Sequence, residues 1–309
     1  MPRARSSVAL AALAVLTLSA CAAGGGTGPA ISSAEPDACP GRVVDVAVSV
    51  AQWGDLVRTL GGACATVTTI ISSAAIDPHD FEPGTAALAA LSSADLVVLN
   101  GAGYDRWAQD AVATLDTGPI VVSAAEVGGI PDQGADPHLW YSPHVVEQMS
   151  TAVSSAMTSL AGRAATDYLA QQAAAWTAKL QPYENAVRAL RARASGRTFA
   201  ATEPVFDRMA AAVGLTDVTP EGYRRASSND SDPAPGDLTG FESALTDGSV
   251  DVLVYNRQTS GTLPEQLRRT AERAGVPVVE VSESPTDPGA SFVPWQVGQL
   301  TQLSKVLAP

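Results

Sequence analysis

The chain has 309 residues, of which 46% are hydrophobic and 17% charged, and its formal net charge is −13. This length is enough for two globular lobes after a targeting segment is set aside. A strongly acidic chain lacks the basic face that a nucleic acid requires, so no nucleic-acid partner is expected. The acidic balance suits solubility and a cationic ligand, although bulk charge alone specifies no site.

Residues 1–20 are typical of a bacterial lipoprotein signal peptide. Arg3 and Arg5 give a positive start, and residues 8–18 are apolar but too few to span a membrane. They lead into Leu18-Ser19-Ala20-Cys21, which resembles a lipobox, whose cysteine is lipidated and begins the mature protein. The alternative is a plain secretory signal with an incidental cysteine. The sequence therefore predicts a lipid anchor at Cys21 on the outer face of the cell membrane.

Residues 21–41 are rich in Gly, Ser, Pro and Ala and are expected to form a flexible tether. With Cys21 lipidated, only Cys39 and Cys64 remain. An even remainder in an oxidising compartment suggests one disulfide, joining the N-terminal segment to the turn after the first helix. A cysteine metal pair is the alternative, which the long separation of the two cysteines in the sequence disfavours.

Residues 42–143 are interpreted as an N-terminal lobe in which strands alternate with helices. The expected strands are residues 43–50, 65–71, 95–99 and 120–122, and the expected helices are residues 53–60, 85–93 and 104–115. Such alternation indicates βα units and a parallel sheet. In sheets of this kind, ligands bind outside the carboxyl ends of the strands.

A helical connection is expected over residues 144–195, because apolar residues recur every three or four positions and no glycine occurs from Ala164 to Ser195. A helix of that length serves as a stiff spacer between lobes as well as a core helix. The strand–helix alternation resumes in a C-terminal lobe, residues 196–309. Its expected strands are residues 198–201, a short strand at Val218, 250–255 and 276–281; its expected helices are 205–213, 241–245, 263–274 and 295–307, with a long polar loop at 224–238.

Two of the three histidines share one short frame, Asp77-Pro78-His79 and Asp136-Pro137-His138. The proline fixes φ and pushes the preceding Asp toward extended geometry, so each histidine follows a stiff, non-helical corner. Imidazole is the commonest protein ligand for transition metals. The pair of frames therefore predicts a shared metal site, against the alternative of two ordinary loop histidines.

Two glutamates occupy matching places in the C-terminal lobe. Glu203 follows the first strand of that lobe and Glu283 follows the last one, just as His79 follows a strand of the first lobe. Two neutral imidazoles and two carboxylates cancel a 2+ charge, which lowers the cost of burying the ion. The alternative for each glutamate is a helix N-terminal acid or a solvated loop charge.

Several segments together resemble the substrate-binding lipoproteins of bacterial zinc and manganese ABC importers, the cluster A-I family. The matching segments are Asp77-Pro78-His79-Asp80-Phe81-Glu82-Pro83, Asn100-Gly101-Ala102-Gly103-Tyr104-Asp105-Arg106-Trp107, Asp136-Pro137-His138-Leu139-Trp140-Tyr141-Ser142-Pro143, Thr202-Glu203-Pro204-Val205-Phe206, Tyr255-Asn256-Arg257-Gln258-Thr259 and Val281-Ser282-Glu283-Ser284. The resemblance covers the chain from about Val43 onward. Phe81 stands where many relatives have Tyr, and the His-rich loop of some zinc-selective members is missing.

The resemblance implies an α/β fold in which two βα lobes with parallel sheets are joined by a long rigid backbone helix, with one metal ion in the cleft between them. It assigns the metal ligands to His79, His138, Glu203 and Glu283, with Asp287 as the reserve for the fourth. It also implies delivery of the ion by a monomer to an ABC permease and its ATPase. The ion is Zn²⁺ or Mn²⁺: two histidines with two carboxylates suit both, and manganese members tend to carry an acid at the third position.

Two other functions are weighed against metal transport. A metal-dependent hydrolase needs an open coordination position and a general base, and neither His-Glu-x-x-His nor a nucleophile elbow occurs in the sequence. A surface adhesin with a structural metal is the third reading. The expected protein is therefore not an enzyme but a carrier that binds and releases its ligand unchanged.

Overall fold

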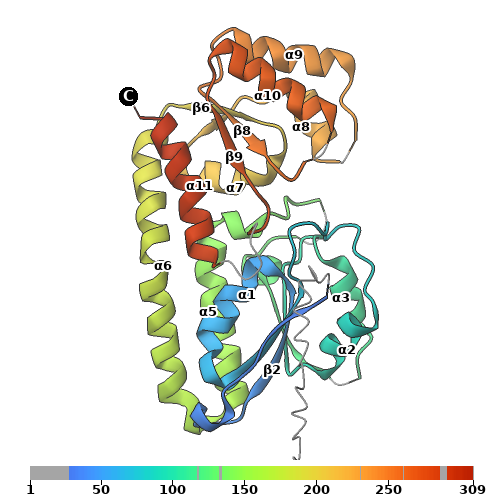
Figure 1. Cartoon of the computed structure of the whole chain (residues 1–309), viewed down its shortest axis with the longest axis vertical. Coiled ribbons are helices and arrows are strands. Elements are labelled where there is room, and N and C mark those ends of the chain that lie inside the picture. The colour runs from blue at the N-terminus through green and yellow to red at the C-terminus, as the bar shows by residue number, and fades with distance from the viewer. Residues whose placement is uncertain are drawn as a thin grey trace, which may run out of the picture.

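The computed structural model describes residues 28–116, 118–131, 134–229, 231–259, 261–285 and 291–308. Two α/β lobes lie one above the other, and one long helix runs beside both of them (Figure 1). The α/β fold class with two lobes and a long connecting helix is confirmed. Within the described ranges, no helix is both long enough and apolar enough to cross a membrane.

The N-terminal lobe is built on a five-stranded sheet with the order β1-β3-β2-β4-β5. Its strands and helices are β1 Ala30–Ser32, β2 Val44–Val50, α1 Ala51–Gly61, β3 Ala65–Ile71, α2 Thr85–Ser93, β4 Leu96–Leu99, α3 Arg106–Ala113, β5 Ile120–Ser123 and α4 Ala124–Val127. Strands β2 to β5 are parallel, whereas β1 pairs with β3 in the antiparallel sense. Strands β2 and β4 are buried, nearly continuous apolar runs, as expected of strands covered on both faces.

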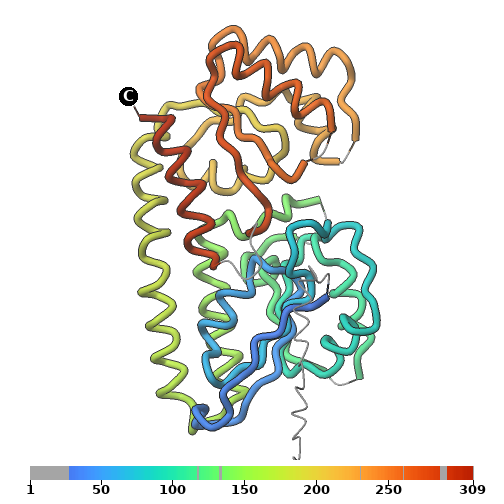
Figure 2. The backbone as a smooth tube through the Cα atoms, viewed as in Figure 1, coloured from blue at the N-terminus to red at the C-terminus, as the bar shows by residue number. Residues whose placement is uncertain are grey.

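The connection consists of two helices, α5 Pro143–Ala161 and α6 Thr166–Ala194. Helix α6 has 29 residues, which corresponds to about 44 Å at the α-helical rise. Its buried stripe, Leu169, Trp176, Leu180, Tyr183, Val187 and Leu190, recurs at helical spacing. Helix α11, Phe292–Val306, returns from the C-terminal lobe and lies alongside α6, as Figure 2 shows.

The C-terminal lobe is built on a four-stranded parallel sheet with the order β7-β6-β8-β9. Its other elements are β6 Thr198–Ala201, α7 Asp207–Val213, β7 Thr216–Asp217, α8 Glu221–Ser227, α9 Pro235–Thr246, β8 Val252–Asn256, α10 Thr262–Ala274 and β9 Val278–Val281. One face of this sheet joins the large core that also fills the N-terminal lobe and the α5–α6 connection. The other face packs on α9 and α10 through Phe241, Leu245 and Leu267.

Three expectations about local structure are wrong. The polar loop expected at 224–238 is shorter in the structure, because α8 extends to Ser227 and α9 begins at Pro235. Pro235 occupies the first turn of α9, where a backbone N–H has no partner within the helix. The strand expected at Val218 lies instead at Thr216–Asp217. Part of the expected tether is ordered against the N-terminal lobe, since Ala30–Ser32 forms β1.

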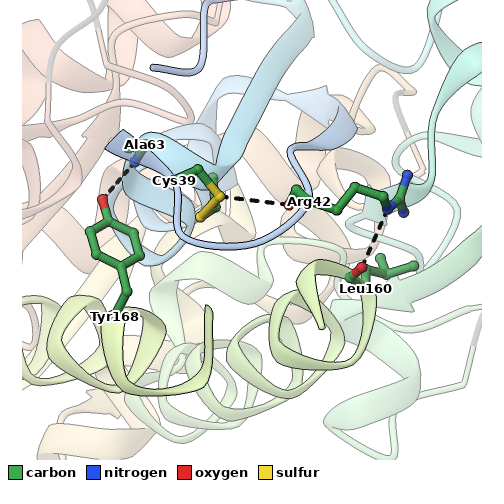
Figure 3. Close-up of a disulfide and its surroundings, with 6 residues drawn as sticks. Cys39, Arg42, Ala63, Leu160 and Tyr168 are labelled. Atoms are coloured by element: carbon green, nitrogen blue, oxygen red, sulfur yellow. Dashed lines mark hydrogen bonds between the residues drawn. A yellow bond between two sulfur atoms is a disulfide. The ribbon is translucent and has the colours of Figure 1, made fainter. Parts of the chain in front are cut away.

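A disulfide joins Cys39 to Cys64 at the turn that follows α1, as expected. Figure 3 shows the neighbouring contacts that hold this region to the helical connection: the Tyr168 hydroxyl accepts the Ala63 N–H at 2.7 Å, and the Arg42 guanidinium donates to the Leu160 carbonyl at 3.3 Å. The segment before β2 is therefore fastened to the turn before β3 and to the end of α5, and that turn is held in its place by the start of α6. The division into lobes at residues 42–143, 144–195 and 196–309 stays a prediction.

Candidate metal centre

The two Asp-Pro-His frames fold into the same turn. The Asp77 carboxylate accepts the backbone N–H of His79 at 2.8 Å, and the Asp136 carboxylate accepts that of His138 at 3.0 Å. This is the bond from an Asp side chain to the backbone two residues on that defines an Asx turn. The shared sequence frame therefore corresponds to a shared local conformation, once in the loop between β3 and α2 and once in the loop between α4 and α5.

His138 is buried and oriented by its own frame. Its Nδ1 lies 2.6 Å from Asp136 Oδ1, and its Nε2 faces Glu283 of the other lobe, 3.8 Å from Oε2. Burial disfavours the charged imidazole, but the contacts with Asp136 and Glu283 outweigh it and raise the pKa of His138 to about 9. A cation that binds Nε2 near neutral pH therefore displaces a proton from it.

A second residue of the C-terminal lobe fixes the same frame. Arg208, on α7, donates from Nε to the Asp136 carbonyl at 3.1 Å and pairs with the Asp136 carboxylate at 3.2 Å. From the N-terminal lobe, the Asn100 amide donates to the Pro137 carbonyl at 2.9 Å. The loop that presents His138 is thus held from both lobes.

The two glutamates follow neighbouring parts of one sheet edge. Glu203 follows β6 and Glu283 follows β9, and between them Asn256 ends β8. The Asn256 amide nitrogen donates to Glu203 Oε2 and, at 2.9 Å, to Glu283 Oε1. Burial raises the pKa of Glu203. Burial also opposes ionisation of Glu283, but the facing His138 holds its pKa below the usual value.

Tyr104 lies between the histidines and the carboxylates. Its hydroxyl donates to Glu283 Oε2 at 3.2 Å and accepts from the Gln52 amide at 3.2 Å. Its ring meets His79 edge-on, with centroids 4.9 Å apart, and lies 6.3 Å from the His138 ring. Burial raises the pKa of Tyr104 well above its ordinary value, so the phenol stays neutral and donates.

Three of the four predicted ligands form one connected group. His138 faces Glu283 directly, and Asn256 links Glu283 to Glu203. His79 is exposed at the edge of this group and packs against Tyr104. Across the described ranges, no three His, Cys, Asp or Glu side chains come close enough together to hold an ion as they stand. Cys21 and the reserve ligand Asp287 lie outside the described residues.

The sequence assigned no role to three residues that support the predicted ligands. Tyr104 and Asn256 contact the ligands themselves, and Arg208 contacts Asp136 in the frame of His138. The first two lie in segments that carry the family resemblance: Tyr104 lies in the loop after β4, and Asn256 ends β8. An asparagine at a strand end is also an ordinary turn residue, so its position alone gives no metal-site signal. Arg208 lies in the middle of a helical pattern, and nothing in the sequence connects it to Asp136.

Residues 46–306 match the protein-family model described as zinc-uptake complex component A, periplasmic. The chain belongs to this family. The expected resemblance is therefore confirmed over almost the whole length from β2 to the last turn of α11.

Relatives in the family carry different metals in their names. The chain is 23% identical to the zinc-binding lipoprotein AdcA of Streptococcus pneumoniae over 267 residues, which cover 77% of this chain and 51% of AdcA. It is 28% identical to the manganese-binding lipoprotein MntA of Halalkalibacterium halodurans over 103 residues, which cover 32% of this chain and 34% of MntA. The chain thus spans about half the length of the first of these curated relatives.

Solved structures share the two-lobed fold at low identity. The periplasmic zinc-binding protein TroA of Treponema pallidum superposes with a TM-score of 0.71 at 16% identity, covering 86% of this chain and 100% of TroA. FpvC of Pseudomonas aeruginosa in complex with Mn²⁺ gives a TM-score of 0.68 at 20% identity, covering 86% and 98%. These similarities establish the arrangement of the lobes and the long helix.

Proposed function

We propose that this protein is an extracytoplasmic solute-binding lipoprotein that captures a divalent transition metal, Zn²⁺ or Mn²⁺, and delivers it to an ABC permease and its ATPase. The observation that carries the proposal is the meeting of the lobes at His138 and Glu283, whose Nε2 and Oε2 atoms lie 3.8 Å apart. Membership of a zinc-uptake family supports the same conclusion. The protein's chemistry is then capture and release of the ion, without turnover of a substrate.

The donor set fits such a cargo. His79 and His138 supply imidazole nitrogens, and Glu203 and Glu283 supply carboxylate oxygens, the ligand types that zinc accepts. Two carboxylates balance the 2+ charge of one ion, so the complex adds little net charge to a buried site. In this proposal the exposed His79 closes the site, while His138 faces Glu283 and Asn256 links Glu283 to Glu203 before the ion arrives.

The place of capture follows from the N-terminus. Cys21 in its lipobox is the proposed acylation site, which holds the mature chain on the outer face of the cell membrane. The names of the relatives AdcA and MntA, both lipoproteins, support this placement. A protein fixed beside its permease and loaded as a monomer releases one ion per encounter.

Metal titration of the mature chain tests the proposal. The chelator-stripped protein is titrated with zinc and with manganese while bound metal and melting temperature are followed. One ion per chain and a marked rise in melting temperature are expected, because an ion that binds only the folded state stabilises it. His79→Ala and His138→Ala should each remove most of the rise.

The third histidine provides a matched control. His144 is exposed in the first turn of α5, so His144→Ala should bind metal like the wild type. Metal binding that survives in both His79→Ala and His138→Ala would refute the site. Metal-dependent hydrolysis of generic esters at a steady rate would favour a hydrolase instead.

A further inference from the structure

Asn256 occupies the one place in the C-terminal sheet that lies between the two proposed acidic ligands. Strand β8 is flanked by β6 on one side and β9 on the other. Because the three strands are parallel, their carboxyl ends meet at one edge of the sheet. The residue that ends the middle strand is therefore placed between Glu203 and Glu283, and that residue is Asn256.

The orientation of the Asn256 amide is fixed by its surroundings. The side chain is 1% exposed, and its Oδ1 accepts the backbone N–H of Gln258 at 3.1 Å. Its Nδ2 donates to one oxygen of Glu203 and to one oxygen of Glu283. A reversed amide would set its oxygen against two carboxylates and its NH₂ group against an N–H. Only the observed orientation satisfies every partner, with one amide hydrogen for each carboxylate.

This arrangement leaves each glutamate one oxygen that Asn256 does not occupy. For Glu283 that oxygen is Oε2, the atom 3.8 Å from His138 Nε2 and 3.2 Å from the Tyr104 hydroxyl. Its partner Oε1 is turned toward Asn256 at 2.9 Å. The carboxylate is therefore oriented so that a single oxygen faces the other lobe.

We propose that Asn256 is a specificity-determining residue that limits both glutamates to one ligand oxygen each and so favours a four-coordinate ion over a six-coordinate one. The inference rests on the proposed function and names the cargo it selects, Zn²⁺ over Mn²⁺. Two histidine nitrogens and two single oxygens make the tetrahedral set typical of zinc. Manganese suits oxygen-rich, octahedral sites, which bidentate carboxylates help to provide.

The neutral amide suits this task better than a charged donor. Two neighbouring, partly buried carboxylates repel each other, and an N–H to each reduces that repulsion without introducing a positive charge. A lysine or arginine in the same place would repel the incoming ion. An asparagine restrains the carboxylates while leaving the full charge of the pair available to the metal.

The test compares Asn256→Ala and Asn256→Leu with the wild type by competitive titration of zinc and manganese. Both variants remove the two N–H donors, and Leu keeps the side-chain volume if Ala loosens the fold. The ratio of the manganese to the zinc dissociation constant should fall about tenfold in both, mainly through tighter manganese binding. Asn185→Ala, an exposed asparagine on α6, should leave the ratio unchanged.

Cobalt(II) supplies a spectroscopic readout, since its visible absorption is strong in four-coordinate sites and weak in six-coordinate ones. The wild type should give the strong spectrum, and the Asn256 variants a weaker one. The inference would be overturned if both variants kept the wild-type ratio of dissociation constants and the wild-type spectrum. A weak spectrum from the wild type would also overturn it. The proposed function would survive either result. A wild type that binds none of these ions would instead refute the proposed function, and this inference with it.

Discussion

The two lobes are built on the same strand order but present their ligands differently. The N-terminal sheet places β3-β2-β4-β5 side by side, and the C-terminal sheet places β7-β6-β8-β9 in the same relation to chain order. The third parallel strand of each sheet, β4 or β8, has a similar sequence that begins after an Asp and ends in an Asn: Asp95-Leu96-Val97-Val98-Leu99-Asn100 and Asp251-Val252-Leu253-Val254-Tyr255-Asn256. Each Asp also pairs with an Arg just before the first parallel strand, Arg42 or Arg197.

The asparagines that end these two strands have different partners. Asn100 is held by the Trp53 indole and donates to the Pro137 carbonyl, so it braces the backbone of the loop that carries His138. Asn256 touches the carboxylates themselves. The N-terminal lobe therefore positions its ligand through a loop, whereas the C-terminal lobe positions its ligands directly at the strand ends. The same order of parallel strands supports both arrangements because the ligands are carried by segments beyond the strand ends.

The largest expected effect is the loss of stability on removal of the disulfide, a covalent link of the N-terminal lobe. The N-terminal lobe contains the Cys39–Cys64 disulfide, which spans 25 residues of sequence. Closing a loop of that length in the unfolded chain is worth about 3 kcal/mol. The double variant Cys39→Ser, Cys64→Ser should therefore lower the free energy of unfolding by about this amount, measured by urea denaturation.

Reducing agent provides the control for that prediction. It should lower the stability of the wild type and leave the double serine variant unchanged. If the wild type were equally stable under oxidising and reducing conditions, the disulfide would make no contribution to the fold. Metal binding by the folded double variant should persist, because neither cysteine lies near the proposed ligands.

The paired asparagines give the next largest effect. Asn100→Ala removes three hydrogen bonds of a buried side chain, to Trp53, Gly101 and Pro137, and should cost about 2 kcal/mol of stability in the metal-free protein. Asn256→Ala should cost less, because Glu203 and Glu283 are only partly buried and water solvates their carboxylates once the amide is gone. Urea denaturation of both metal-free variants measures the difference. Equal losses of stability would show that the two asparagines stabilise the fold equally, against this prediction.

The Asp of each histidine frame tests how the N-terminal lobe orients its ligands. Asp136 contacts the His138 imidazole as well as its backbone, whereas Asp77 is bonded to the backbone of His79. Loss of a carboxylate that orients a metal-binding histidine typically weakens affinity at least tenfold. Asp136→Ala should therefore weaken zinc and manganese binding alike by roughly tenfold, measured by competitive titration. Asp77→Ala is the matched variant and should have the smaller effect.

The sequence predicts the scaffold of the site better than its interior. Buried runs such as Leu96–Leu99 and residues 252–255 are apolar, so such strands, and the strand ends where the ligands were expected, can be located from the sequence pattern. The roles of Tyr104 and Asn256 depend on which strands become neighbours, a property of the folded sheet that local pattern does not specify. The helices that shorten the polar loop at 224–238 were missed because Ser, Asp and Pro there favour turns and caps equally.

The smallest expected effect on stability comes from the Arg–Asp ion pair that occurs once in each lobe. Asp251 accepts the Thr198 backbone N–H at 2.7 Å and pairs with Arg197 at 2.9 Å; the N–H bond, with the pair, holds the pKa of Asp251 below its usual value. A carboxylate whose pKa is lower in the folded than in the unfolded state stabilises the protein at pH values above the unfolded pKa of about 3.9. This stabilisation is lost as the pH falls through the folded-state pKa. Because the pair is partly exposed and screened, Asp251→Asn should cost less than about 1 kcal/mol at neutral pH.

Urea denaturation of Asp251→Asn and wild type from pH 7 to pH 3 checks this last prediction. The difference in stability should be full at neutral pH and should shrink as the pH falls below the unfolded pKa toward the lowered folded pKa of Asp251. Asp95→Asn in the N-terminal lobe is the matched variant: Asp95 accepts the Asp45 N–H at 3.0 Å and pairs with Arg42 at 3.0 Å. Arg42 also donates to the Leu160 carbonyl. The N-terminal pair is thus tied to the helical connection, and its loss should affect the packing of α5 on the lobe, whereas the loss of Asp251 stays local to the strand end.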